Sequence, residues 1–189
     1  MTETDECLAA RAKAGDRRAF ENLVRRHKVR LFRLCRRYVG GADEAYDLVQ
    51  EAFASAWIGL TRYDERRPFI AWLRAIALNK CRDFGRRRSV RRLFLAAFAR
   101  EQASLASNPT EPPASATDDR LNRLDHEIAR LPTAPKEALL LISLGGLSHQ
   151  EAAAELGISV KAVEMRVYRA KRRLAARLNV NDGSDGEGE

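Results

Sequence analysis

The stretch LSHQEAAAELGISVKAVEMRVYRAKRRL, residues 147–174, decides the fold that we expect for the C-terminal part of the chain. Ser148 and Glu151 have the spacing of a capping box, in which each side chain accepts a hydrogen bond from the other residue's backbone. Gly157 supplies the positive φ of a tight turn, and Ser159 can cap the helix that follows. Two helices joined by such a turn are typical of a helix-turn-helix motif.

The second helix of this motif is predicted to have an apolar inner face and a basic outer face. Its inner residues recur at steps of three and four: Val160, Val163, Val167, Ala170 and Leu174. The residues expected to contact DNA are Ser159, Lys161, Ala162, Glu164, Met165, Arg166, Arg169, Lys171, Arg172 and Arg173. A helix fits the major groove, where its N-terminal half reads bases and its flanks meet phosphates. The alternative is an ordinary pair of helices with a solvated basic face.

The rest of the chain also has helical periodicity, and no stretch shows sustained strand alternation. Asp16 is a natural N-cap, and the pattern that follows it stops at Gly40 and Gly41. A second helix is predicted from about residue 43 to 60, with Leu48, Val49, Phe53 and Trp57 in its buried stripe. A third is predicted from Pro68 towards Arg88, and the segment RRLFLAAFAREQ, residues 91–102, could extend a helix.

We therefore predict an all-α protein of two small helical domains joined by a flexible linker. The first domain spans residues 1–95, and the linker spans 96–117, a segment rich in Ala, Ser, Thr and Pro. The second domain spans 118–180 and contains the helix-turn-helix. The acidic tail 181–189 is expected to be disordered.

The composition indicates a basic, globular protein. The chain has 189 residues, 34 Lys+Arg against 26 Asp+Glu, and 45% hydrophobic residues, enough for a packed core. Two concentrated basic zones, residues 1–100 and 161–177, suggest two contacts with one polyanion. No apolar run is long enough to cross a membrane, and the three cysteines lie far apart without metal-ligand spacing. We expect a cytoplasmic protein without membrane insertion, metal or cofactor.

Three blocks of this sequence together resemble one known family. DEAYDLVQEAFASAW (residues 43–57), RPFIAWLRAIALNKCRDFGRRR (67–88) and, after a linker, the helix-turn-helix are similar to extracytoplasmic-function (ECF) sigma factors of bacterial RNA polymerase. The resemblance covers roughly residues 5–178 and implies that the first domain reads the −10 promoter element and the second reads the −35 element. It also implies three partners: core RNA polymerase through its β′ clamp helices and β flap, promoter DNA, and an anti-sigma factor.

By this resemblance, a polar face of the second helix docks on the basic clamp helices of the polymerase. Its residues are Asp43, Glu44, Asp47, Gln50 and Glu51. The alternative is an exposed helix face whose acidic residues merely favour the positive N-terminal end of the helix dipole.

The resemblance also assigns −10 DNA to the loop after the second helix and to the third helix. The residues are Arg62, Tyr63, Arg66, Arg67, Arg74, Asn79, Lys80, Arg82, Arg86, Arg87 and Arg88. Tyr63 could stack on a base that is flipped out of the strand, or simply pack against Trp57 or Phe69. Trp72 is expected to lie in the core.

Two features depart from the family pattern. Family recognition helices often carry Thr or Lys near the positions of Ala162 and Glu164. Here Glu164 could accept from a cytosine amino group, and Met165 could contact a thymine methyl group. The apolar residues at the linker entrance are also unusual, and they could extend the first core or dock an anti-sigma partner: Leu93, Phe94, Leu95 and Phe98.

Other classes of protein fit the sequence less well. The three histidines share no ligand spacing with the cysteines or carboxylates, and the glycine pairs lack the Lys-Ser/Thr of a phosphate loop. We therefore expect no enzymatic activity and no small-molecule substrate. A stand-alone helix-turn-helix regulator would leave the first domain's match unexplained. A sigma mimic that titrates an anti-sigma factor would need neither a basic recognition helix nor three consecutive arginines.

Overall fold

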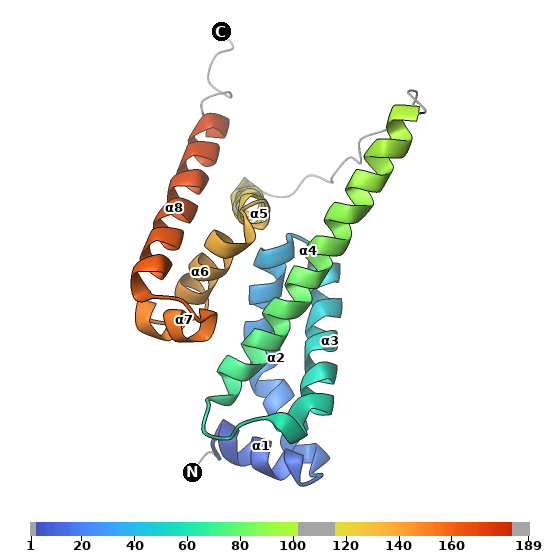
Figure 1. The fold of residues 1–189 in the computed structure, drawn as a ribbon, viewed down its shortest axis with the longest axis vertical. Coiled ribbons are helices and arrows are strands. Elements are labelled where there is room, and N and C mark those ends of the chain that lie inside the picture. Colours follow the sequence, from blue (N-terminus) through green and yellow to red (C-terminus); the bar gives the residue numbers. More distant parts are fainter. Residues whose placement is uncertain (1–2, 102–115, 183–189) are drawn as a thin grey trace.

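A computed structural model describes residues 3–101 and 116–182, and every element in these two ranges is a helix. The elements are α1 (Asp5–Lys13), α2 (Arg17–Val39), α3 (Ala42–Gly59), η1 (Leu60–Arg62), α4 (Phe69–Glu101), α5 (Ala116–Ala129), α6 (Thr133–Ser143), α7 (His149–Leu156) and α8 (Val160–Asp182). In Figure 1, α1 to α4 form one bundle and α5 to α8 form a second group beside it. The all-helical fold class is confirmed.

The first helix, α1, was not expected from the sequence. The hydroxyl of Thr4 caps it by accepting from the backbone N–H of Cys7 (3.3 Å). Its inner residues Leu8, Ala9 and Ala12 are at most 3% exposed because α1 crosses the ends of α2 and α4. This stripe is too short and too rich in alanine to give a strong periodic signal.

Both ends of α2 follow the sequence prediction. The carboxylate of Asp16 accepts from the backbone N–H of Ala19 (3.1 Å), which satisfies a donor at the helix start. Gly40 ends the helix in the left-handed conformation, with φ of 88°. A Cβ at Gly40 would lie 3.0 Å from the side chain of Ala129 on α5. Glycine is thus required here for its conformation and for the close approach of α5.

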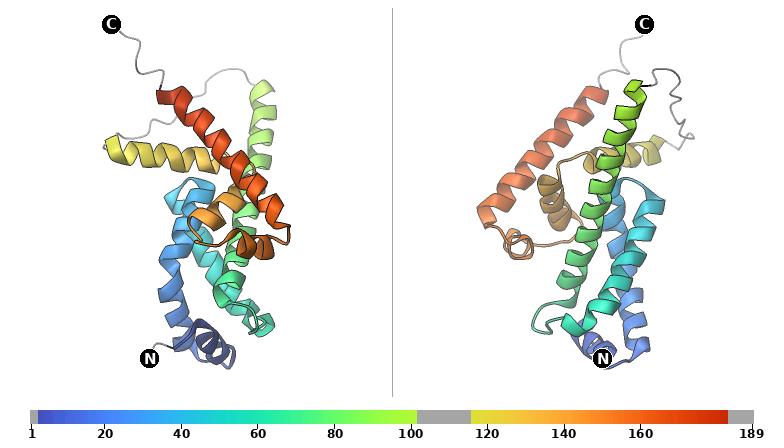
Figure 2. Two further views of the ribbon diagram at one scale, coloured as in Figure 1. Left: turned by 90° about the vertical axis from the view of Figure 1, so that its left-hand side faces the viewer. Right: turned by 45° about the vertical axis from the view of Figure 1, so that its right-hand side comes forward.

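The third predicted helix, α4, runs past Arg88 to Glu101 without a break, so residues 91–101 extend it, as the sequence allowed. Figures 1 and 2 show its C-terminal half projecting beyond α2 and α3. Leu93, Phe94 and Leu95 are 72%, 65% and 61% exposed, so the expectation that they extend the first core is wrong. Their part of α4 has passed the end of the bundle and has no core to join.

The expected linker and tail are described only in part. Helix α4 covers residues 96–101 and α5 begins at Ala116, so helix enters the expected linker from both sides. The linker residues 102–115 and the tail residues 183–189 lie outside the described residues, as does the side chain of Phe98.

The helix-turn-helix forms as predicted. Glu151 and Ser148 make both hydrogen bonds of the capping box, at 3.2 Å and 2.8 Å. Gly157 has φ of 64°, and the hydroxyl of Ser159 accepts from the backbone N–H of Ala162 (3.2 Å). Four of the five expected inner residues of α8 are at most 8% exposed: Val163, Val167, Ala170 and Leu174. The fifth, Val160, is 37% exposed because it starts the helix, before α8 has turned onto α6.

The two groups of helices pack against each other. Helices α5 and α6 lie against α2, as the views in Figures 1 and 2 agree. Residues of both groups, among them Tyr38 of α2 and Leu140 of α6, belong to one continuous cluster of buried side chains. The chain therefore adopts a closed arrangement in which parts of both domains are covered.

Candidate nucleic-acid interface

The face of α3 assigned to polymerase is open in the closed arrangement. Four of its five residues are exposed and Glu44 is half-buried; the exposed ones are Asp43, Asp47, Gln50 and Glu51. Tyr46 lies on the same turns and is 60% exposed. The sequence argument considered only charge and did not include Tyr46. Its spacing could have indicated it, because it follows Asp43 by three residues and precedes Gln50 by four. The face thus combines carboxylates with a large apolar ring.

In the loop between α3 and α4 the arginines are exposed, but the tyrosine is buried. Tyr63 is 3% exposed, and its hydroxyl donates to the carbonyl of Arg67 at 2.5 Å. Its ring packs on Phe69 and Trp72, with centroids 5.6 Å and 5.0 Å away. Burial raises the pKa of Tyr63 to about 12. The stacking role expected of Tyr63 is therefore not available in this conformation, and the alternative of packing holds, with Trp72 in place of Trp57.

Trp72 and Trp57 differ from each other in burial. Trp72 is half-buried among the rings of Tyr63 and Phe69, which agrees with its expected place in the core. Trp57, expected to be buried, is 38% exposed and packs one side on Phe20 at a centroid distance of 5.0 Å. Position 57 lies at the C-terminal end of α3, where less of the bundle covers it.

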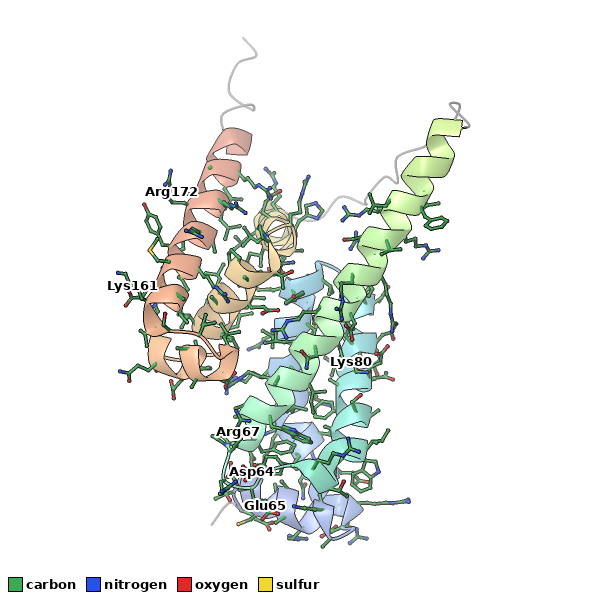
Figure 3. All side chains as sticks on the ribbon, viewed as in Figure 1. Asp64, Glu65, Arg67, Lys80, Lys161 and Arg172 are labelled. Carbon is green, nitrogen blue, oxygen red and sulfur yellow. The ribbon has the colours of Figure 1, made fainter. Side chains whose placement is uncertain are left out.

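The arginines of the loop are exposed and partly balanced by acidic neighbours. Arg66 pairs with Asp64 (3.0 Å), and this pairing holds the pKa of the Asp64 carboxyl below its usual value. Glu65 pairs with Lys13 of α1 (3.1 Å). Arg62 and Arg67 are exposed beside them. Figure 3 shows Asp64, Glu65 and Arg67 at the end of the bundle near α1.

Helix α4 divides the remaining −10 residues into two groups. Asn79, Arg86, Arg87 and Arg88 are exposed, and Lys80 pairs with Glu51 of α3 at 3.5 Å. Arg86 pairs with Asp83, which lowers the pKa of that carboxyl. Arg74 and Arg82 behave differently, because both are held by carboxylates of the C-terminal domain. Arg74 is only 6% exposed.

The two interdomain contacts are bidentate. Arg74 donates through Nε to Glu155 of α7 (3.1 Å) and through Nη2 to the second oxygen of the same carboxylate. Arg82 donates to both oxygens of Glu137 on α6, at 2.6 Å and 2.7 Å. Glu137 was not singled out from the sequence, since 55 residues separate it from Arg82 and no local pattern links them.

The outer face of α8 is open along its length. Most of its expected DNA-contacting residues are exposed, while Ala162 and Arg166 are half-buried. Lys161 pairs with Glu164 at 3.5 Å, and the guanidinium of Arg172 lies 5.9 Å above the ring of Tyr168. In Figure 3, Lys161 and Arg172 point away from the rest of the molecule. Tyr168, 55% exposed, adds an aromatic surface that the sequence argument had not included.

Within the described ranges, no group of His, Cys, Asp and Glu side chains could hold a metal ion. No helix in those ranges is long and apolar enough to cross a membrane. The described residues form three charged surfaces: an open acidic face on α3, an open basic face on α8, and a basic face on α4 that is partly covered.

A helical domain with an exposed acidic face, followed by a helix-turn-helix domain, points to the class of protein. The chain matches the family model described as Sigma-70 region 2 over residues 23–91 and the model described as Sigma-70, region 4 over residues 121–174. It belongs to the ECF RNA polymerase sigma factor family. A sigma factor is a transcription initiation factor and not an enzyme. Membership of this family excludes the alternative of a stand-alone regulator.

Particular relatives resemble this chain over nearly its whole length. It is 39% identical to RNA polymerase sigma factor CnrH of Cupriavidus metallidurans, covering 95% of this chain and 96% of that protein. It is 32% identical to ECF RNA polymerase sigma factor SigD of Mycobacterium tuberculosis, covering 89% and 81%. Among solved structures it resembles CnrH in complex with the cytosolic domain of CnrY, with a TM-score of 0.71 and 36% identity over 94% of this chain and 99% of that one.

Proposed function

We propose that this sigma factor docks on the clamp helices of core RNA polymerase through α3 and directs the enzyme to promoters with −10 and −35 elements. The observation that carries this proposal is the open pair of faces, acidic on α3 and basic on α8, at separate places on one molecule. Opposite charges on a protein and its partner favour association and fix its orientation. Polymerase and promoter DNA place this activity in the cytoplasm.

Docking through α3 is tested by reversing its charge. Asp47→Lys with Glu51→Lys is expected to abolish binding to core polymerase and to leave the helical content unchanged, because both side chains are exposed. Fluorescence anisotropy of labelled protein titrated with core polymerase measures the affinity, and circular dichroism measures the fold. Glu3→Lys with Glu21→Lys is the matched control, since it changes the charge equally at two positions away from α3, one before α1 and one on α2. Unchanged affinity in the α3 variant would refute the assignment.

Recognition of the −35 element is proposed for the outer face of α8. Its N-terminal residues Lys161, Glu164 and Met165 are exposed, and a helix in the major groove contacts base edges with such residues. The basic residues further along α8 are placed to meet phosphates. We further propose that the C-terminal domain contacts the β flap, which holds it near the −35 element.

Recognition of the −10 element is proposed for the loop and α4. Arg62, Arg66 and Arg67 are exposed in the loop, and Arg86 to Arg88 are exposed on α4. Contacts that form only with the opened strand would shift the promoter towards its open state, because a ligand favours the state it binds better. No chemical bond changes in this step.

The function itself is tested by transcription from a fragmented genomic template with core polymerase, with and without this protein. We expect new 5′ ends that share a two-part upstream motif. Absence of new starts, together with tight DNA binding by the protein alone, would contradict the proposed role.

Control by an anti-sigma factor is also proposed, because the relative CnrH has been solved in complex with the cytosolic domain of CnrY. The apolar side chains of Leu93 and Leu95 are exposed on α4 and form a candidate docking surface. Purified CnrY cytosolic domain is the probe, with CnrH as the positive control. We expect it to inhibit transcription by this protein, and Leu93→Glu with Leu95→Glu to relieve that inhibition.

A further inference from the structure

Two arginines assigned to −10 DNA are already occupied by carboxylates of the chain's own C-terminal domain. Glu155 of α7 binds Arg74, and Glu137 of α6 binds Arg82, each through both carboxylate oxygens. Both arginines lie on α4, and both carboxylates come from the domain that carries the helix-turn-helix. The contacts therefore link the −10 face to the domain assigned to the −35 element.

The site around Arg82 is built for a carboxylate. Glu137 is 3% exposed and also accepts from the hydroxyl of Tyr38 on α2 at 3.0 Å. Next to it, the ammonium of Lys136 donates to the carbonyl of Tyr38 (3.1 Å) and lies 4.6 Å from the centroid of the Tyr38 ring. Buried charges are stable only when paired and hydrogen-bonded, as these are. The contact is thus part of the packed interface and not a chance meeting of surface side chains.

Further polar contacts between the two domains lie along this interface. Asp125 of α5 lies 2.9 Å from Arg37 and 3.9 Å from Arg36, both on α2. Arg30 of α2 donates to the backbone carbonyl of Gly145, after α6. With the exception of Lys136, the N-terminal domain supplies the cations of these contacts and the C-terminal domain supplies the acceptors.

A guanidinium binds a carboxylate or a phosphate by the same fork of parallel hydrogen bonds. The Nε and Nη2 donors that each arginine gives to its carboxylate cannot bind a phosphate at the same time. We propose that Glu137 and Glu155 compete with the phosphates of the −10 strand for Arg82 and Arg74. Together with Asp125, which holds the same interface through Arg36 and Arg37, they form an acidic face on the C-terminal domain. The closed arrangement is then a form that does not bind −10 DNA, and binding requires the two domains to separate. This inference rests on the proposed function of α4.

The competition is selective, because the other two faces stay open. The α3 residues Asp47 and Glu51 are exposed in the closed arrangement, and so are Lys161 and Arg169 of α8. Polymerase docking and contact with duplex DNA by α8 are therefore compatible with closure. The −10 contacts that the C-terminal domain blocks are those of Arg74 and Arg82.

The test removes the acidic face without touching the arginines. Full-length Glu137→Gln with Glu155→Gln is compared with wild type for binding to a labelled single-stranded oligonucleotide carrying the −10 sequence found by the transcription assay. We expect at least tenfold tighter binding and a larger radius of gyration in small-angle X-ray scattering. Glu3→Gln with Glu21→Gln is the control, because it changes the charge equally at sites away from the interface, and it should change neither quantity.

A second variant guards against misfolding at the buried Glu137. Asp125→Asn removes a charge at the interface and leaves Glu137, Glu155 and both −10 arginines in place. We expect it also to raise the radius of gyration and the affinity for the oligonucleotide, with helical content unchanged. Variants that open but bind the oligonucleotide no tighter would refute the competition. Variants that neither open nor bind tighter would show that the acidic face does not hold the domains closed.

Failure of the proposed function would be recognised separately. If wild type directs no new transcription starts with core polymerase, the sigma role itself fails. If wild type directs transcription and the interface variants bind as wild type does, the competition alone is overturned.

Discussion

At the scale of single residues, Lys136 illustrates how the closed arrangement uses charge. This lysine is 7% exposed, and its ammonium donates to the carbonyls of Tyr38 and Ala129. Burial lowers the pKa of Lys136 to about 8, although the negative charge of Glu137 opposes the shift. Burial therefore disfavours the charged form of this lysine. Its hydrogen bonds to two backbone carbonyls offset part of that penalty, which an apolar side chain could not do.

This shift predicts a dependence of stability on pH. Because the pKa of Lys136 is lower in the folded state, the unfolded chain binds more protons above pH 8. The free energy of unfolding should therefore rise with pH, by about 1 kcal/mol between pH 8 and pH 9. The raised pKa of the Cys81 thiol acts in the opposite direction from about pH 8 upwards, where the unfolded chain begins to lose this proton, and offsets part of the rise in wild type. Urea unfolding at the two pH values measures the change, and Lys136→Met should abolish it. A rise that survives in the variant would exclude Lys136 as its source.

Residues that act locally were predictable, and residues that act across the domains were not. Ser148, Gly157 and Ser159 could be assigned because their partners lie within three or four positions. The partners of Arg74 and Arg82 lie 81 and 55 positions away, so only the packed structure reveals them. For the same reason, the sequence alone could not decide whether Tyr63 stacks on a DNA base or packs in the core.

At the scale of elements, helix ends were easier to predict than helix extent. Asp16 and Gly40 place the ends of α2 by chemistry that each residue carries itself. The apolar stripe of α4 stops before Arg88, so the sequence left open whether residues 91–102 extend the helix, and in the structure it continues to Glu101. Arginine, leucine and alanine have high helix propensity, so this segment remains helical without a core beneath it.

The helix-turn-helix gives a prediction at this scale. Ser148→Ala removes the two hydrogen bonds of the Ser148 hydroxyl, one from the backbone N–H of Glu151 and one to its carboxylate, and should lower the free energy of unfolding by about 1 kcal/mol. Gly157→Ala places a Cβ at φ of 64° and should cost about 1–2 kcal/mol. Chemical denaturation monitored by circular dichroism measures both. Ser89→Ala, at an exposed position of α4, is the control and should change stability by less than either. Equal effects at all three sites would contradict the assigned turn.

At the scale of the whole molecule, the distribution of charge separates three tasks. The acidic face of α3 and the basic face of α8 are open, while part of the basic face of α4 is covered by the C-terminal domain. Composition alone indicated a polyanionic partner, because the net charge is +8. Composition could not indicate which basic side chains pair with carboxylates inside the molecule, because those pairs depend on how the two domains pack together.

The open face of α8 predicts how duplex DNA binding by the free protein depends on salt. Each phosphate contact releases condensed counterions, so the logarithm of the association constant falls linearly with the logarithm of salt concentration, by about 0.9 per contact. Arg169→Ala with Arg173→Ala should therefore reduce the slope by about 1.8. Anisotropy titrations of a labelled duplex at several salt concentrations measure it.

The control for this experiment is Lys28→Ala with Arg33→Ala, which removes two exposed cations from α2 and leaves α8 intact. Both variants lower the net charge by the same amount, so a general loss of attraction would weaken them equally. A change of slope confined to the α8 variant would identify direct phosphate contacts, because counterion release depends on where charge is neutralised and not on the total. Equal slopes in the two variants would mean that the free protein binds duplex DNA through no defined face.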